Sequence, residues 1–538
     1  MLDIAIAIII TCLASSAYYF KWAPAEFLEF SIYDMRFKPH DKVSSPVVIV
    51  AIDDESIARL GQWPWQWSSI ARMINLLNSY GPKVIGVSIM FSENNFNQGL
   101  QEVRNLIKKI EEDPRLITKK RFRKIYHFYQ SLKDAEKKLD NDAILSASIG
   151  ESGKVVLPVD FILGSSLRST EAEMTDYLKR NSIPLGDQSC CLAAREIIPS
   201  MPDFANKALG LGHITVLADK DGKVRSEPLL VSYQDRVFPS FGLQLALKYL
   251  NYDIKDLRIL NGLTFGNVNV PTYGQNMMRI SFNRGFTYFP FHEVVNNKIP
   301  AESFKDKIVI IAQNSTGLGA MHVTPIGTNV PSWRIMANVI NNILNNDYIV
   351  RPEWAFHLEI GVIVFFGIFL AVAIPVLKPG IGAIASLVLI LIWIGAGEYL
   401  WVYNGYWIKI VYPSALLMLG YIILASKRYY VTIKTRERIE EDSFETNKML
   451  GLSFQGQGNL DMAFDKFRKC PIEDELIKDL FYNLGLDFER KRMFNKAVAV
   501  YEHIAQTGNF KDIEERIKRL RAAGDTIIFG LGGTKRNP

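Results

Sequence analysis

Long apolar runs are the strongest pattern along the chain. One occupies residues 2–20, and three more follow one another at 355–377, 381–403 and 407–425. A helix rises about 1.5 Å per residue, so each run nearly or fully crosses a hydrocarbon core of about 30 Å. We therefore predict four membrane helices. The links at 378–380 and 404–405 are so short that the last three must be antiparallel neighbours.

The first run has a second interpretation. Small residues at 14–17 resemble the end of a cleaved signal peptide. However, no Lys or Arg precedes the apolar core, whereas a signal peptide normally has one there. We favour an uncleaved anchor and keep cleavage as the alternative.

Charge beside the last run sets the orientation. Basic residues follow it at Lys427, Arg428, Lys434, Arg436 and Arg438. The positive-inside rule places that end in the cytoplasm. Counting the spans backwards puts residues 21–353 outside the cytoplasm and the N-terminus inside.

Four polar residues lie in or beside the spans, namely His357, Glu359, Glu398 and Lys409. Charge in lipid is costly and often functional. All four map to the outer ends of their spans, so snorkelling or a Glu398–Lys409 contact across the short outer loop is the simpler expectation.

Residues 21–353 alternate between strand and helix patterns. Residues 46–52 and 83–91 are apolar, β-branched runs, and 68–80 between them has one apolar helical face. This order is a βαβ unit, so part of the sheet should be parallel. Further strands are predicted at 154–159, 228–232, 278–282 and 307–312, and helices at 240–250 and 333–345. The fold class is therefore α/β, with a single mixed sheet flanked by helices.

A charged insert interrupts this pattern at residues 94–140. It holds 12 Lys and Arg against 7 Asp and Glu, which accounts for most of the formal charge of +6. The spacing predicts two charged helices around Pro114. A solvated insertion is the simpler interpretation, and an arm that touches anionic lipid or an acidic partner is the alternative.

Composition narrows the class of protein. The 538 residues are 48% hydrophobic and 22% charged, which excludes a mostly disordered chain. A mean hydropathy of +0.06 argues against a polytopic transporter. The small net charge does not predict a nucleic-acid partner, and four cysteines exclude a disulfide-built scaffold.

Several stretches, taken in order, resemble the CHASE type 2 domain, an extracellular sensor associated with cyclases and histidine kinases. They lie at 33–37, 47–65, 83–93, 219–231, 238–247, 305–312 and 324–344, and the resemblance covers roughly residues 20–352. It implies an extracytoplasmic sensor domain followed by three spans.

The chain departs from the pattern of these domains at three places. Ser88 stands where an Asp is usual in the second strand, and Ala312 stands where a Gly usually follows the late strand. Residues 332–336 read Ser-Trp-Arg-Ile-Met in place of Gly-Val-Glu-Ile-His. Ligand contacts that those polar residues make in relatives are therefore not expected here.

Candidate ligand-binding residues follow the first strand. Asp53, Asp54 and Glu55 come directly after it, and ligands bind at the carboxyl ends of parallel strands. The acidic group could hold a cation or an amine, or it could cap the next helix. Further candidates are Trp63 and Trp65, for which core packing is the simpler role, and Arg225, which lies beside the Asp221–Gly222 hairpin turn. Arg284, before Gly285, is a basic candidate without a specific signal.

No pattern indicates a metal site, a cofactor or a catalytic nucleophile. The seven histidines are scattered, and no Gly-x-Ser-x-Gly or kinase catalytic motif occurs. We therefore expect no catalysis by these residues. Cys190 and Cys191 lie outside the cytoplasm, where a strained mutual bond, two thiols or a bond between protomers are all open.

The region after the spans carries a repeat of 34 residues. Leu450-Gly451-x-x-Phe454 returns as Leu484-Gly485-x-x-Phe488, Ala463 returns as Ala497, and Phe467 as Tyr501. This is the tetratricopeptide pattern of small and aromatic positions. Such repeats bind peptides or neighbouring domains, so the candidate partner-binding residues are Phe454, Phe467, Phe488 and Tyr501.

These patterns divide the chain into six segments. They are an anchor (1–20), a sensor domain (21–353), three membrane helices (354–426), a juxtamembrane helix (427–446), repeats with a capping helix at 512–521 (447–525) and a linker or tail (526–538). The order resembles the front half of CHASE type 2 serine/threonine kinases, in which a kinase follows the repeats.

We therefore expect a bacterial inner-membrane receptor. It would pass a periplasmic or extracellular small-molecule or envelope signal through the three spans to the cytoplasmic repeats. A homodimer and a cytoplasmic protein partner, such as a serine/threonine kinase, are expected. The alternative is a structural scaffold whose repeats recruit partners.

Overall fold

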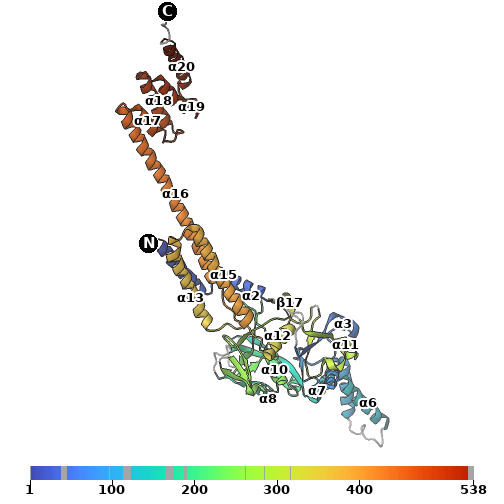
Figure 1. Ribbon diagram of the computed structural model, residues 1–538. Helices are drawn as coiled ribbons and strands as arrows, with labels where there is room; N and C mark the ends of the chain where they lie inside the picture. Colours follow the sequence, from blue (N-terminus) through green and yellow to red (C-terminus); the bar gives the residue numbers. More distant parts are fainter. Residues whose placement is uncertain are drawn as a thin grey trace, which may run out of the picture. The chain divides into compact units, whose positions relative to one another are not determined.

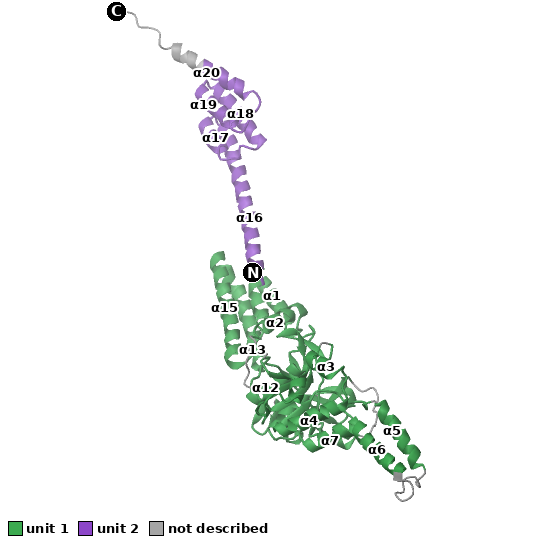
Figure 2. Ribbon diagram, turned by 90° about the vertical axis from the view of Figure 1, so that its right-hand side faces the viewer, with its two compact units in different colours: residues 1–418 green, residues 419–538 purple. Residues whose placement is uncertain are grey.

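The computed structural model forms two compact units, residues 1–418 and 419–538 (Figure 2). It describes residues 2–37, 45–95, 97–112, 123–164, 174–186, 191–260, 262–283, 285–315 and 317–530. Arg284, Cys190 and Pro114 lie outside the described residues.

Within the described residues, four helices are long and apolar enough to cross a membrane, as the apolar runs predict. They are α1 (Leu2–Tyr19), the segment Trp354–Val376, α15 (Pro379–Asn404) and α16 (Val411–Gly456). The second comprises α13 (Trp354–Ile368), the π-helical turn η5 (Phe369–Ala373) and α14 (Ile374–Val376). The predicted last span and the juxtamembrane helix are thus one helix, while residues 407–410 lie before it and are not helical.

A ten-stranded mixed sheet organises the first unit (Figure 1). Its order is β14-β1-β15-β2-β3-β5-β8-β9-β4, with β6 also paired to β3. The strands β14, β1, β15, β2, β3 and β6 are parallel neighbours, so their carboxyl ends share one edge. Their bounds are β1 Val47–Ile52, β2 Val84–Val87, β3 Val155–Leu163, β6 Gly210–His213, β14 Thr287–Pro290 and β15 Ile308–Gln313. The others are β4 Ile183–Pro184, β5 Leu192–Pro199, β8 Leu230–Tyr233 and β9 Arg236–Pro239.

Helices cover both faces of the parallel part, and the alternation within β1 shows why. Val48, Val50 and Ile52 pack with α4 (Trp67–Tyr80), α7 (Asn141–Ser152) and α11 (Phe291–Val295). Val47, Ile49 and Ala51 pack instead with α10 (Phe241–Tyr249) and α12 (Ser332–Asn345). A strand whose two faces are both buried reads as a continuous apolar run, which is how β1 appears in the sequence.

The expectation of one sheet is only partly right. The predicted strand at 278–282 forms β13 (Met277–Arg279), which pairs with β7 (Ser226–Pro228) in a sheet of its own. Two more small sheets are β10-β11-β12, at Arg258–Leu260, Gly262–Phe265 and Val268–Val270, and the hairpin β16-β17, at Met321–Thr324 and Gly327–Pro331. They lie outside the main sheet because their short strands pair locally.

The charged insert forms two helices, as its spacing predicts. They are α5 (Gln98–Glu111) and α6 (Arg123–Leu139), and they extend away from the sheet (Figures 1 and 2). Short connecting helices complete the first unit: α2 Ala23–Met35, α3 Asp54–Leu60, α8 Asp176–Arg180, α9 Pro202–Ala205, and the 3-10 turns Ile254–Asp256 and Ala301–Ser303.

The second unit is helical. After the end of α16 it contains α17 (Leu460–Phe467), α18 (Glu475–Arg490), α19 (Phe494–Ala505) and α20 (Ile513–Gly530), so residues 526–530 of the predicted tail are helical. The predicted partner-binding side chains lie inside: Phe467, Phe488 and Tyr501 are at most 2% exposed, and Phe454 packs against the same core. These four side chains hold the helices of this unit together, and their partner-binding role stays a prediction.

Equivalent contacts recur at the 34-residue offset. A Cβ added at Gly451 would lie 2.4 Å from the Phe467 ring, and one added at Gly485 would lie 2.4 Å from the Tyr501 ring. Glycine at these positions therefore lets an aromatic ring close against a helix backbone. The tetratricopeptide likeness itself stays a prediction.

We predict that Gly485→Ala destabilises the second unit. The new methyl group collides with the buried Tyr501 ring, and overpacking of this kind costs about 1–3 kcal/mol. Hydrogen exchange of α18 and α19 in the full chain, measured over a urea series, should show the loss. Gly456→Ala is the control, because nothing lies within 4 Å of its added Cβ. Equal protection in the two variants would contradict the packing role.

Candidate ligand pocket and polar junction

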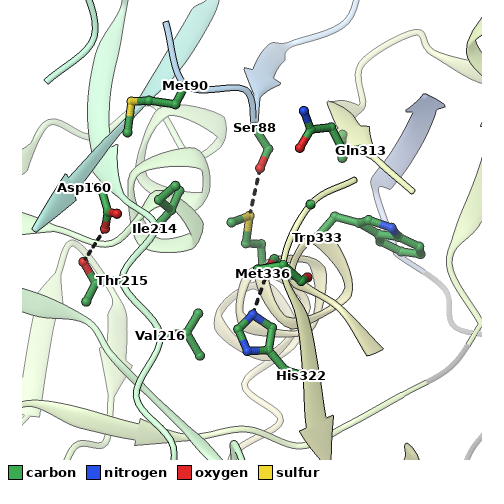
Figure 3. A pocket seen from close by; sticks show the side chains of 14 residues that line it. Ser88, Met90, Asp160, Ile214, Thr215, Val216, Gln313, His322, Trp333 and Met336 are labelled. Atoms are coloured by element: carbon green, nitrogen blue, oxygen red, sulfur yellow. Dashed lines mark hydrogen bonds between the residues drawn. The ribbon is translucent and has the colours of Figure 1, made fainter. Parts of the chain in front are cut away.

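A cavity of about 390 Å³ opens at the carboxyl ends of β2, β15 and β6 (Figure 3). The start of α12 and the β16–β17 hairpin close its other side. Its lining residues are Ser88, Met90, Asp160, Ile214, Thr215, Val216, Ala312, Gln313, Gly319, Ala320, His322, Ser332, Trp333 and Met336. In open α/β sheets ligands bind at this edge, which makes this cavity the candidate ligand pocket.

The polar groups of the pocket come from different elements. Thr215 donates to the Asp160 carboxylate at 3.3 Å, and Ser88 donates to the Met336 sulfur at 3.7 Å (Figure 3). The Gln313 amide lines the wall at the end of β15. Among the described residues that line the pocket, Asp160 is the only Asp, Glu, Lys or Arg. The pocket therefore offers hydrogen bonds and one negative charge within a largely apolar wall.

His322 is held in one tautomer by its neighbours. The Ser332 hydroxyl donates to the Ala320 carbonyl at 3.0 Å, so it must accept from His322 Nε2, which lies 2.9 Å away. Burial lowers the pKa of His322 below its usual value. The ring is therefore neutral near pH 7, with Nε2 protonated and Nδ1 left as an acceptor.

The acidic stretch after β1 has structural partners. Asp53 caps α3 by accepting from the Ser56 amide at 2.8 Å, and it also accepts from the Tyr288 hydroxyl at 2.7 Å. Asp54 accepts from Ser315, and Glu55 forms an exposed pair with Arg59. Of the two sequence interpretations, the structure therefore supports the helix cap. Among the described residues, no three His, Cys, Asp or Glu side chains gather as metal ligands.

The tryptophan candidates belong to the core. Trp65 is 5% exposed, and its indole donates to the Gly61 carbonyl at 2.7 Å. Trp63 packs edge-on against Trp65, with ring centroids 5.3 Å apart. Neither residue lines the candidate pocket.

Arg225 lies at a polar junction between the sensor domain and the membrane helices. Its side chain is fully buried and donates to Asp34 at 2.7 Å, Asp219 at 2.9 Å and Asp221 at 2.6 Å. Lys223 also pairs with Asp34 at 2.7 Å. Because Asp34 belongs to α2, this cluster fixes α2 on the sensor domain.

The other end of α2 binds the start of α16. Glu29 accepts from the amides of Ile410 at 3.0 Å and Val411 at 2.9 Å, and Glu26 pairs with Lys409. These amides would otherwise be the unsatisfied donors of a helix N-terminus. Burial raises the pKa of Glu29 to about 7, and the two backbone donors oppose that rise.

Glu359 of α13 connects α1 and α13 to the loop that precedes α16. It accepts from the Lys409 amide at 2.8 Å, from Arg351 at 2.8 Å and from the Tyr18 hydroxyl. The buried Glu359 carboxylate therefore accepts from three donors, one of which is the positively charged Arg351. A buried charge requires such partners.

The expected Glu398–Lys409 contact does not form. Glu398 pairs with Arg36 at 2.8 Å, and Lys409 pairs with Glu26. Both partners come from the segment at residues 23–36, far away in sequence. Of the four polar residues near the spans, only His357 is exposed.

Comparison with family models gives one match. The model of the CHASE2 domain matches residues 5–374, well over half of the chain. The chain belongs to the CHASE2 family. It is thus a sensory receptor of signal transduction, and its four apolar helices mark it as a membrane protein. Comparisons with curated proteins and with solved structures give no match.

The departures of this CHASE2 chain from the usual pattern converge in space. Ser88, Ala312, Ser332, Trp333 and Met336 all line the candidate pocket. The sequence alone marks these positions as departures from the family pattern and does not indicate that they form a site. Their clustering in one wall is the available sequence signal for the pocket.

We predict that Asp53→Ala destabilises the CHASE2 domain by about 1 kcal/mol, the usual value of an N-cap. Partial burial alone would raise the pKa of Asp53, but hydrogen bonds from Ser56 and Tyr288 outweigh it, and the pKa is lowered. The stabilisation should be complete above the unfolded pKa of about 3.9 and should fade as the pH falls through the folded value. Thermal unfolding against pH measures this. Glu55→Ala is the exposed control, and equal losses in both variants would exclude the cap.

We predict that Arg225→Gln is far more damaging. It leaves three carboxylates near one another without their central cation, and breaking a buried ion pair costs about 3–5 kcal/mol. Thermal unfolding of the detergent-purified chain should show a large loss. Arg258→Gln, at an exposed position on β10, should change stability by no more than about 0.5 kcal/mol. Similar melting temperatures for both variants would show that the cluster contributes nothing.

Proposed function

We propose that this CHASE2 receptor senses a small molecule in the candidate pocket and passes the change through α2 to α16. The observation that carries the proposal is the double attachment of α2. Asp34 binds Arg225 of the sensor domain, and Glu29 binds the first amides of α16. One short helix therefore connects the sensing domain to the helix that continues into the second unit.

A short segment connects the pocket to this junction. Residues 214–216 line the pocket, and Asp219 and Asp221 follow within a few residues to bind Arg225. The β16 strand that carries His322 is bonded to the same region, because the Val224 amide donates to the Val323 carbonyl at 2.7 Å. Both walls of the pocket are thus joined to the chain segment 219–225, which carries Arg225 and two of its three carboxylate partners.

The pocket chemistry limits the ligand class. Asp160 is the one fixed charge, and the hydroxyl, amide and neutral imidazole groups offer hydrogen bonds. An anion would face Asp160 without a compensating cation among the described lining residues. The signal is therefore a small uncharged or cationic polar molecule, and binding shifts the receptor because the two conformations bind it with different affinity.

The topology and output form the second part of the proposal. The basic residues after the apolar part of α16 support a cytoplasmic second unit and an extracytoplasmic sensor domain in a bacterial inner membrane. The helical second unit passes the signal to a protein partner, for which a serine/threonine kinase is the output implied by resemblance. We propose that the receptor acts as a homodimer and that these residues have no catalysis of their own.

We predict that Thr215→Trp abolishes ligand binding, because its bulk fills the pocket. A screen of small polar molecules by thermal shift of the full chain should yield compounds that stabilise the wild type. Their affinity should fall by at least about tenfold in the variant. Thr264→Trp, on β11 and away from the pocket, is the matched control. Compounds that stabilise both variants equally do not bind in the pocket.

Transmission is tested separately from binding. Asp34→Asn weakens the link between α2 and Arg225 while leaving the pocket intact. With a ligand from the screen, hydrogen exchange at the start of α16 should change in the wild type and in the exposed control Asp235→Asn. It should not change in Asp34→Asn, although binding persists. A second unit that holds its partners whether or not ligand is present would favour the scaffold alternative.

A further inference from the structure

A second cavity lies where the sensor domain meets the membrane helices. Its volume is about 500 Å³, and it is bordered by the ends of α1 and α13, by α2, by the 219–221 turn and by the loop before α16. Aromatic side chains form much of its wall, and five of its lining residues are cations: Lys21, Lys220, Arg279, Arg351 and Lys409. Neither the CHASE2 match nor the proposed sensing route assigns it a ligand.

Arg279 is the unusual residue of this cavity. It is only 9% exposed, and its guanidinium stacks 4.4 Å from the Tyr273 ring centroid and 4.3 Å from that of Trp407. Its Nε is buried without a hydrogen-bond partner, and no described carboxylate lies within ion-pair distance. A buried cation without an anion is costly, which contrasts with the three carboxylates around Arg225.

Two more buried donors of the cavity lack acceptors. They are Nη1 of Arg351 and the indole Nε1 of Trp407. Three carboxylates, Glu26, Asp219 and Asp221, also line the cavity, so five lining cations face three lining carboxylates and two positive charges remain in excess. The unmatched charge of the cavity is therefore positive, and its unmatched polar atoms are donors.

An anion that offers several acceptor oxygens fits these donors. Guanidinium groups bind phosphate oxygens in a fixed fork geometry, and the aromatic wall suits an attached apolar chain better than a free ion. The cavity adjoins the sensor-side ends of two spanning helices, which is the level of lipid headgroups. On α2, Phe27 and Leu28 are 53% and 59% exposed, as expected for a helix lying at a membrane surface.

We propose that this cavity binds the phosphate headgroup of an anionic phospholipid, with Arg279 as its central cation. The acyl chains would lie along the exposed apolar side chains of α1 and α2. The lipid would then complete the polar junction on which α2 rests. The inference goes beyond the receptor function, and its test does not need the pocket ligand.

The test is lipid binding to the full chain. Native mass spectrometry of the purified protein, titrated with phosphatidylglycerol or phosphatidylcholine, counts bound lipids directly. We expect specific binding of phosphatidylglycerol and a loss of affinity of roughly tenfold or more in Arg279→Gln. Arg258→Gln, which removes an exposed charge on β10, should bind as the wild type does. Equal binding of the two lipids by the wild type would overturn the proposal.

Two further arms keep the result decisive. If Arg279→Gln does not fold, Trp407→Phe keeps the stacked ring but removes a buried donor, and it should still weaken phosphatidylglycerol binding; undiminished binding would overturn the site. In the wild type, inorganic phosphate and glycerol phosphate compete against the lipid. Failure of both to displace it supports the lipid assignment. Displacement at comparable concentrations would overturn that assignment in favour of a soluble anion.

Discussion

The polar junction between α2 and the sensor domain depends on the ion pairs of the buried Arg225 guanidinium with three carboxylates. A buried guanidinium that is removed from solvent needs negative charge and hydrogen-bond acceptors nearby. The three carboxylates supply both. Two of them come from a turn of the sensor domain, and the third comes from α2. The electrostatic requirement of one side chain therefore fixes how the first membrane-proximal helix sits on the sheet domain. The same helix then satisfies the first amides of α16 through Glu29.

The sequence predicts elements that depend on neighbouring residues better than it predicts contacts between residues far apart in the chain. Apolar runs and local periodicity predict the four spanning helices, β1 and α4. They succeed because burial of one face of a helix or strand, or burial in a membrane, requires apolar residues at regular positions within a short segment. The partners of charged residues were missed because they are distant in sequence. The sequence places Arg225 beside a hairpin turn, yet one of its ion-pair partners is Asp34, which lies 191 positions away. Glu398 seemed to suit Lys409, yet both bind residues near the N-terminus.

The candidate site shows a related limit. Asp53, Asp54 and Glu55 after β1 are candidate ligand-binding residues in the sequence. However, an Asp that caps a helix and an Asp that binds a ligand have the same sequence signature. The described lining of the candidate pocket combines apolar and small polar residues with a single Asp and a single His, and no motif in the sequence joins them. Only the parallel register, which brings the ends of β2, β15 and β6 to one edge, makes them a site.

Pocket and junction share one stretch of chain, and this has a mechanical consequence. Residues 214–216 border the pocket, whereas Asp219, Asp221 and Arg225 hold α2. Close-packed elements change between discrete arrangements more readily than they deform continuously. A ligand that moves this stretch must either leave the Arg225 cluster intact and carry α2 with it, or separate buried charges at a cost of several kcal/mol. Moving α2 is the cheaper outcome, and α2 holds the start of α16.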